Sequence, residues 1–139
     1  MMNKNFEIIS YVGVGEIKFG MSMEQLKSIF NCPPEIEYYD PVMKVTKLTW
    51  YNINVRLNSK KEVEEISFSE GAFRPVYNNN DLLADPDLAK NLGKTEKPLN
   101  TVGFKVSFES GIAITGFSKK KDDKSVTVFA KQLIADWIS

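Results

Sequence analysis

Four runs of β-forming residues follow one another through connections too short for a crossover, and this feature most restricts how the chain can fold. The runs cover residues 36–39, 43–51, 53–57 and 63–69. Neighbouring parallel strands need a connection of a dozen or more residues, so we expect these runs to pair antiparallel. The polar residues 58–61 then form a hairpin turn between the last two strands. The first half of the chain therefore contains a predicted antiparallel meander.

A short strand over residues 6–12 and a well-marked helix start precede the meander. Ser22 is a preferred N-cap residue, and Gln25 stands three positions later, where its side chain can reach back to the cap. Met21 and Leu26 occupy the two positions of a hydrophobic staple. The adjacent prolines 33 and 34 are expected to end the helix.

The second half of the chain contains the same kinds of element in less regular form. Residues 70–80 include Gly, Pro and Asn and predict a surface linker. Asp85 and Pro86 predict a helix start, and Gly93 is placed to end that helix. The remaining predicted elements are hairpin strands at 101–109 and 112–117, a charged turn at 119–124, a strand at 125–130, and a short helix at 132–138 anchored by Leu133, Trp137 and Ile138.

These elements predict a single domain, residues 1–139, of the α+β class. We expect an antiparallel sheet with short helices and not a wound parallel sheet. Because the order helix then antiparallel strands occurs twice, the sequence also predicts two degenerate helix-plus-meander repeats, 6–70 and 80–139. A chain of 139 residues can bury a core without disulfides or a metal.

The absence of histidine restricts the chemistry of the chain. It removes the usual general base, the Ser-His and Cys-His pairs, and the commonest metal ligand. Cys32 is the single cysteine, and the glycines at 13 and 15 lack the spacing of a phosphate-binding loop. We therefore expect no catalysis, no cofactor and no metal site. A hydrolase that uses the strand carboxylates Glu62 and Glu64 is the remaining enzymatic alternative.

Charge and hydropathy restrict the partners and the location. Eighteen basic residues balance eighteen acidic ones, and only Arg56 and Arg74 are arginines. A protein that holds nucleic acid by its phosphates needs a basic surplus, so we expect no nucleic-acid partner. No apolar run approaches the length of about 20 residues that a membrane helix needs, and residues 1–7 lack the apolar core of a signal peptide. We expect a cytoplasmic protein with no membrane partner.

Adjacent aromatic residues and clustered carboxylates favour a binding role. The adjacent pairs Tyr38–Tyr39 and Trp50–Tyr51 each lie on a predicted strand, so the two members of a pair face opposite sides. Tyr and Trp on an open sheet face would favour protein binding, and acidic residues at 62–70 and 81–87 could steer a cationic partner. Alternatively, the fold's own helices and loops cover both faces, and the charges only solvate loops. The candidate partner-binding residues are Tyr38, Tyr39, Trp50, Tyr51, Glu62, Glu64 and Asp81.

One segment carries a family resemblance. The residues GEIKFGMSMEQL at 15–26, followed by Phe30 and Pro33, are similar to the bacterial pattern I-x-F/L-G-M-S/T-x-x-x-V/L, which opens a helix. They resemble the module of the β-lactamase inhibitory protein and the small outer-membrane assembly lipoproteins, over about the first 70 residues. Asn31 and Cys32 stand where that family usually has a helix-ending glycine. The resemblance implies a helix-plus-meander unit that binds proteins and is not catalytic.

Within this broad group, cytoplasmic chains of about this length resemble immunity proteins encoded beside polymorphic or contact-dependent growth inhibition toxins. That resemblance implies a protein partner, the cognate toxin domain, such as a nuclease, whose active site the immunity protein occludes. The alternative within the same group is an inhibitor or assembly partner of a cell-envelope protein, which requires export.

Overall fold

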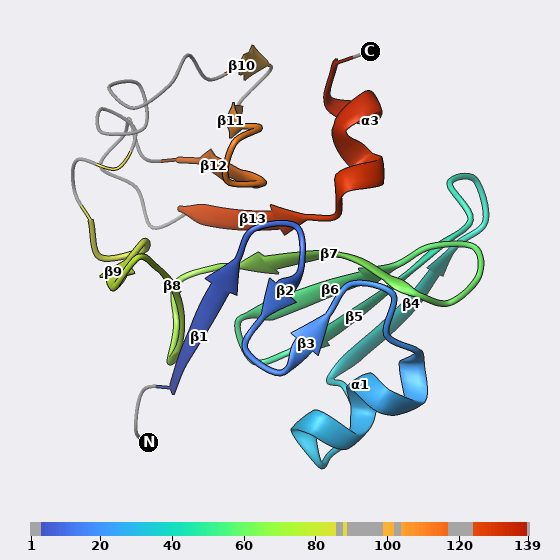
Figure 1. The fold of residues 1–139 in the computed structure, drawn as a ribbon. Helices are drawn as coiled ribbons and strands as arrows, with labels where there is room; N and C mark the ends of the chain where they lie inside the picture. The colour runs from blue at the N-terminus through green and yellow to red at the C-terminus, as the bar shows by residue number, and fades with distance from the viewer. Residues whose placement is uncertain (1–3, 86–87, 89–98, 102–103, 117–123, 139) are drawn as a thin grey trace.

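The computed structural model describes residues 4–85, 88, 99–101, 104–116 and 124–138 (Figure 1). Its strands form a five-stranded sheet with the order β3-β2-β1-β8-β9 and an eight-stranded sheet with the order β10-β11-β12-β13-β7-β6-β5-β4. The pairing is mostly antiparallel and the described helices are short, in agreement with the predicted α+β class. No described helix has the length and apolar character needed to cross a bilayer.

The small sheet consists of β1 (Lys4–Ile9), β2 (Gly13–Val14), β3 (Ile17–Lys18), β8 (Phe73–Tyr77) and β9 (Asn80–Asp81). The large sheet consists of β4 (Ile36–Asp40), β5 (Val45–Trp50), β6 (Ile53–Leu57), β7 (Val63–Phe68), β10 (Leu99–Thr101), β11 (Phe104–Ser107), β12 (Ile112–Thr115) and β13 (Ser125–Phe129). The helices are α1 (Met23–Phe30), the 3-10 helix η1 (Lys131–Leu133) and α3 (Ile134–Ile138).

Helix α1 begins as the sequence predicts. The Ser22 hydroxyl accepts a hydrogen bond from the Gln25 N–H at 3.2 Å, and Gln25 Oε1 accepts one from the Ser22 N–H at 2.9 Å. This reciprocal pair is the capping box. The helix ends before the two prolines, because Asn31 adopts the left-handed conformation with φ 56° and donates its N–H to the Lys27 carbonyl. Asparagine tolerates this conformation, so it replaces the usual glycine at the helix end.

The predicted meander is confirmed by β4, β5, β6 and β7, which pair antiparallel in sequence order. Their burial alternates with a period of two: Leu48 and Trp50 point into the core, whereas Lys47 and Thr49 face outward. The polar residues 58–61 form the expected turn between β6 and β7. Just before this turn the β6–β7 register shifts between Arg56 and Leu57, which marks a β-bulge.

The predicted linker at 70–80 is wrong, because this segment contains β8, which runs parallel to β1. Phe73 supplies the reason: its ring packs edge-on against Phe6 of β1 with centroids 5.2 Å apart. Asn52 ties the same strand to the large sheet, donating to the Phe73 and Ser69 carbonyls and accepting from the Phe73 N–H. The connection from β1 to β8 includes α1 and the whole meander. The short connections within the meander therefore give no sign of this parallel pair.

The described part of the second half confirms the β11–β12 hairpin and the final strand β13. Most of the helix predicted from Asp85 to Gly93 and most of the charged turn at 119–124 lie outside the described residues, so the repeats stay a prediction. The C-terminal helix is present as η1 and α3. Leu133 is buried and Trp137 packs against Phe129, but Ile138 is 66% exposed and anchors nothing, because the helix ends there.

The main core lies between the two sheets and under α1 (Figure 1). Beside this core, partly buried Phe30, the last residue of α1, stacks on Trp50 of β5, with ring centroids 4.4 Å apart and an interplanar angle of 9°. Trp50 also donates its indole N–H to the Cys32 carbonyl at 3.0 Å. A second apolar cluster under the C-terminal helix contains Val106, Ala113, Phe129 and Leu133.

The capping box gives a stability prediction. Replacing Ser22 with Ala removes the hydroxyl that accepts the Gln25 N–H, and we expect the free energy of unfolding to fall by about 1 kcal/mol. Ser28→Ala is the control in the same helix, because the Ser28 hydroxyl only donates to the Gln25 carbonyl. Urea unfolding followed by circular dichroism measures both variants, and equal losses would contradict the assigned cap.

Candidate protein-binding face

One face of the large sheet stays open over β4 to β7, and strand register aligns its side chains in two rows. The first row runs Ile36, Thr49, Asn54, Ser67 and the second runs Tyr38, Lys47, Arg56, Glu65. The opposite face of β5 to β7 carries the buried apolar residues. The expected open sheet face therefore exists, but it carries hydroxyl, amide and basic groups more than carboxylates.

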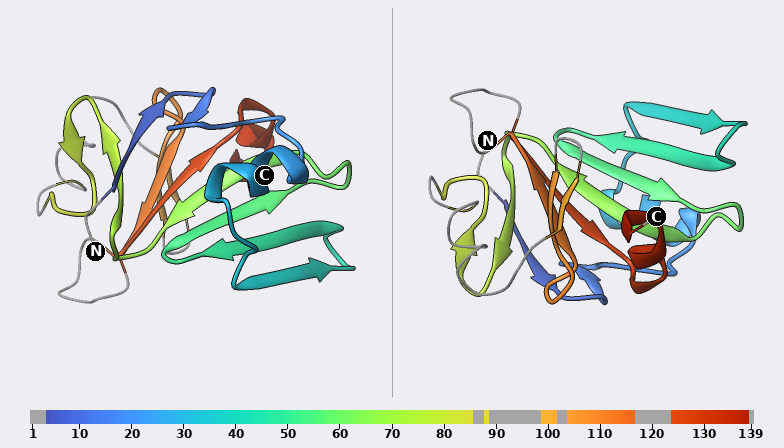
Figure 2. Two further views of the ribbon diagram at one scale, coloured as in Figure 1. Left: turned by 90° about the horizontal axis from the view of Figure 1, so that it is seen from below. Right: turned by 90° about the horizontal axis from the view of Figure 1, so that it is seen from above.

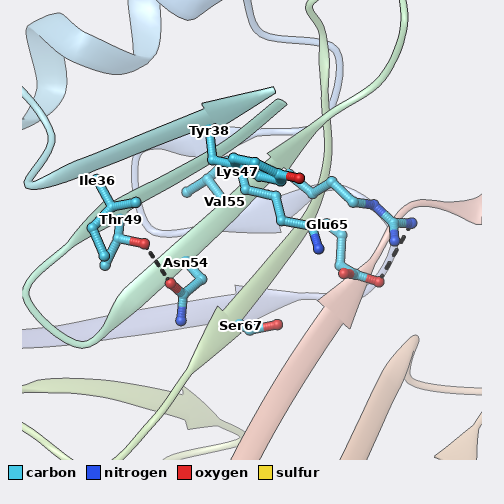
Figure 3. A pocket seen from close by; sticks show the side chains of 9 residues that line it. Ile36, Tyr38, Lys47, Thr49, Asn54, Val55, Glu65 and Ser67 are labelled. Atoms are coloured by element: carbon cyan, nitrogen blue, oxygen red, sulfur yellow. Dashed lines mark hydrogen bonds and ion pairs between the residues drawn. The ribbon is translucent and has the colours of Figure 1, made fainter. Parts of the chain in front are cut away.

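A shallow depression of about 480 Å³ lies in this open face (Figure 3). The Thr49 hydroxyl donates to Asn54 Oδ1 at 2.6 Å across the strand pair. This arrangement leaves the Asn54 Nδ2 donors directed away from Thr49 (Figure 3). Within the part of the chain that the structure describes, these donors and the Lys47 ammonium make no hydrogen bond or ion pair. The lining residues are Ile36, Tyr38, Lys47, Thr49, Asn54, Val55, Arg56, Glu65 and Ser67.

Arg56 sits beside the depression and holds two consecutive glutamates. Its Nε lies 2.8 Å from Glu64 Oε2, and a terminal nitrogen lies 3.6 Å from Glu65 Oε1. The register shift makes this possible, because β7 has an extra residue, Glu64, between the partners of Arg56 and Leu57, so two consecutive glutamates approach Arg56. The carboxylates that the sequence placed on a wet strand face are thus ion-paired within the protein.

Glu65 has a shifted acidity. Burial raises the pKa of its carboxyl above the ordinary value, and the nearby carboxylates of Glu64 and Asp136 act in the same direction. The positive charges of Arg56 and Lys47 oppose that rise without cancelling it. Ionised Glu65 therefore costs folding free energy, since its charged form is held in a desolvated position.

The second arginine neutralises the other acidic cluster. Arg74 is buried, and its guanidinium contacts Asp81 at 2.8 Å and 3.2 Å and Glu70 Oε1 at 2.7 Å. Hydrogen bonding to Asp81, assisted by Glu70, raises the pKa of Arg74. Asp81 also accepts the N–H groups of Leu83 and Ala84. The main role of Asp81 is to hold the β8–β9 region. Arg74 neutralises the charges of Asp81 and Glu70, which belong to the expected acidic strip.

Two candidate residues are wrong as surface residues. Trp50 is 1% exposed, because it faces the core under Phe30. Glu64 is 7% exposed, because Arg56 holds it. Glu62 is exposed beside the β6–β7 turn, where its backbone bridges to Ser22. Glu62 and Glu64 therefore do not form a pair of free carboxylates.

The tyrosine candidates separate into two places. Tyr51 is half-exposed in the β5–β6 turn, where its ring packs edge-on against Phe73 at 5.2 Å. Tyr38 and Tyr39 lie on β4, on opposite faces of the strand, and both are about half-exposed. Lys61 Nζ lies 5.2 Å from the centroid of the Tyr39 ring.

Beside these two tyrosines the structure brings together residues that sequence reasoning missed. They form, with the tyrosines, a cluster that we call the β4 patch: Ile36, Tyr38, Tyr39, Val42 and Met43, each at least half exposed. Val42 is 88% exposed at the tip of the β4–β5 hairpin. The available signal was this tip, where two apolar residues occupy positions that usually carry polar ones.

The position of β4 explains the exposure of the patch. β4 is an edge strand of the large sheet (Figure 2), and its residues Ile36, Tyr38 and Tyr39 are exposed, while Lys27 of α1 reaches its Glu37. Comparison with models of protein families, with curated proteins and with solved structures found no match. The fold and site define a two-sheet α+β protein whose outer hairpin carries an exposed aromatic and aliphatic patch.

The raised pKa of Glu65 predicts a pH dependence. The folded protein binds the Glu65 proton more tightly than the unfolded chain, so the stability held below pH 4.5, the ordinary value, is lost as pH rises through the folded pKa. Glu65→Gln removes this loss. The free energy of unfolding of the variant, relative to the parent protein, should therefore increase as pH rises from about 4.5 toward neutrality.

Urea unfolding at a series of pH values measures this difference. Glu16→Gln, in the turn between β2 and β3, controls for the loss of one negative charge elsewhere. If the difference between Glu65→Gln and the parent protein stays constant with pH, the assigned environment of Glu65 is wrong.

Proposed function

We propose that this chain is an immunity protein that binds a bacterial toxin domain and occludes the toxin's active site. The observation that carries the proposal is the β4 patch. Its five apolar residues share one edge strand and hairpin tip, with Ile36 and Tyr38 on one face of the strand and Tyr39 on the other. Groups of exposed apolar residues often mark interaction sites. Tyrosine is also among the residues that contribute most to binding energy at interfaces.

The surroundings of the patch suit a protein partner. Ile36 and Tyr38 border the depression, so an apolar contact surface adjoins the donors of Lys47 and Asn54. Interfaces combine an apolar centre with such a polar rim. Because Arg56 and Arg74 neutralise much of the acidic strip, binding through the patch would depend on shape and aromatic contact more than on long-range attraction.

Two further features support the proposal. The β4–β5 hairpin lies at the outer side of the large sheet (Figure 2), and its exposed tip at Val42 and Met43 could enter a concave active site. The order of α1 followed by β4 to β7 also matches the helix-plus-meander unit implied by the sequence resemblance. In that group the unit binds proteins.

Co-expression with the product of the adjacent upstream gene, which the proposal requires to be the toxin, tests the proposed function. We expect the two proteins to co-purify and the chain to restore growth to cells that make the toxin. A toxin that remains active and unbound in the presence of folded chain would contradict the proposed function.

The patch also predicts which substitutions weaken the complex. Tyr38→Ala should cost about 2 kcal/mol of binding free energy, or roughly 30-fold in Kd, as expected for an interface tyrosine that loses its ring. Ile36→Ala should weaken binding to a smaller degree. Ile9→Ala is the matched control, because Ile9 is 47% exposed against 56% for Ile36 but lies on β1 in the small sheet. Calorimetry measures the three values, and equal effects of Ile36→Ala and Ile9→Ala would exclude the patch as the interface.

A further inference from the structure

The free edge of β4 offers a second kind of contact beyond the side chains of the patch. The two described sheets end in four edge strands: β3, β9, β10 and β4. The first three have only two or three residues, whereas β4 has five. A very short edge strand limits pairing with strands of other chains, and β4 is too long for this protection. Its run also contains no proline and no lysine, the residues that most often block an edge.

The backbone of β4 is therefore available for pairing. β5 occupies one side of the strand, and no described strand lies on the other side (Figure 2). Because the N–H and C=O groups of successive residues in a strand alternate in direction, part of the backbone of β4 points outward. Five residues present an edge of roughly 17 Å.

We propose that an extended strand of the toxin domain pairs with this outer edge of β4 and continues the large sheet by one strand. The inference rests on the proposed function and adds the mode of recognition. In strand addition, main-chain hydrogen bonds supply affinity, and side chains on alternate positions supply specificity.

The side chains of β4 specify the chemistry of the added strand. On the face of the depression, Ile36 and Tyr38 would lie beside alternate residues of the partner, which favours aliphatic or aromatic side chains there. On the other face, half-exposed Glu37 forms an ion pair with half-buried Lys27 of α1, at 3.2 Å. A lysine or arginine in the partner strand would complement it. The expected partner strand thus alternates apolar and basic residues.

Charge also argues against a second copy of this chain as the occupant. Residues 35–40 include Glu35, Glu37 and Asp40 and no basic residue. Pairing two β4 edges would bring two such acidic segments together, and like charges on facing strands are destabilising. A basic strand from a different protein relieves this repulsion.

Hydrogen exchange of the complex with the toxin domain tests the strand addition. We expect outward-facing amides within residues 36–40 to exchange at least about tenfold more slowly in the complex than in the free chain. A complex that forms while these amides exchange as in the free chain would overturn the strand addition and leave the proposed function standing. Failure to form any complex would overturn both. Slow exchange at β4 in the free chain, together with a dimer by sedimentation, would identify a second copy as the occupant and overturn the proposal.

A charge reversal gives an independent measurement. Glu37→Lys should weaken toxin binding by about fivefold to tenfold, because the basic partner residue would then meet a like charge. Glu16→Lys makes the same change of charge at an exposed turn of the small sheet and should leave Kd unchanged. Glu37 is exposed and its pair with Lys27 is a surface pair, so folding should tolerate the substitution. Equal Kd values for the two variants would contradict a basic strand at β4.

Discussion

The stack of Phe30 on Trp50 is the contact on which the arrangement of this surface depends. It fixes the end of α1 against β5, and the hydrogen bond from the Trp50 indole to the Cys32 carbonyl fixes the chain just after the helix. Only a few residues then lead into β4, so the same contact sets where the edge strand starts. A helix of eight residues is about 12 Å long, and here it covers the inner strands. The helix reaches β4 through the ion pair of Lys27 with Glu37 and leaves Ile36 and Tyr38 exposed.

The two arginines determine which charges are available to a partner. Arg56 engages Glu64 and Glu65 in the large sheet, while Arg74 engages Glu70 and Asp81 beside the small one. Removing a partner from a buried ion pair is costly, because the other charge is left desolvated. These carboxylates therefore serve the fold first, and the proposed recognition falls to the tyrosines and the edge of β4.

Local sequence rules were sufficient for elements whose causes lie close together in the chain. The capping box at Ser22 and Gln25 involves residues three positions apart, and the meander follows from short turns between alternating strands. β8 could not be found in this way, because its pairing with β1 depends on the distant contact of Phe6 with Phe73.

The site shows the same division between local and distant causes. The sequence places Trp50 and Tyr51 on one strand, but β5 ends at Trp50, which faces the core, and Tyr51 lies in the turn that follows. The burial of Glu64 depends on a bulge and on Arg56 across the hairpin. The exposure of β4 depends on its edge position in the sheet, which strand order decides and local sequence does not. Tyr38 and Tyr39 could be named from the sequence, whereas the patch around them could not.

Site-specific photocrosslinking in cells that make both proteins tests whether the toxin domain binds at β4. A benzophenone side chain at position 38 would lie on β4, and the same group at position 12, an exposed site before β2, reports on the small sheet. We expect a covalent adduct with the toxin domain from position 38 and none from position 12. An adduct from position 12 with none from position 38 would show that the partner binds elsewhere.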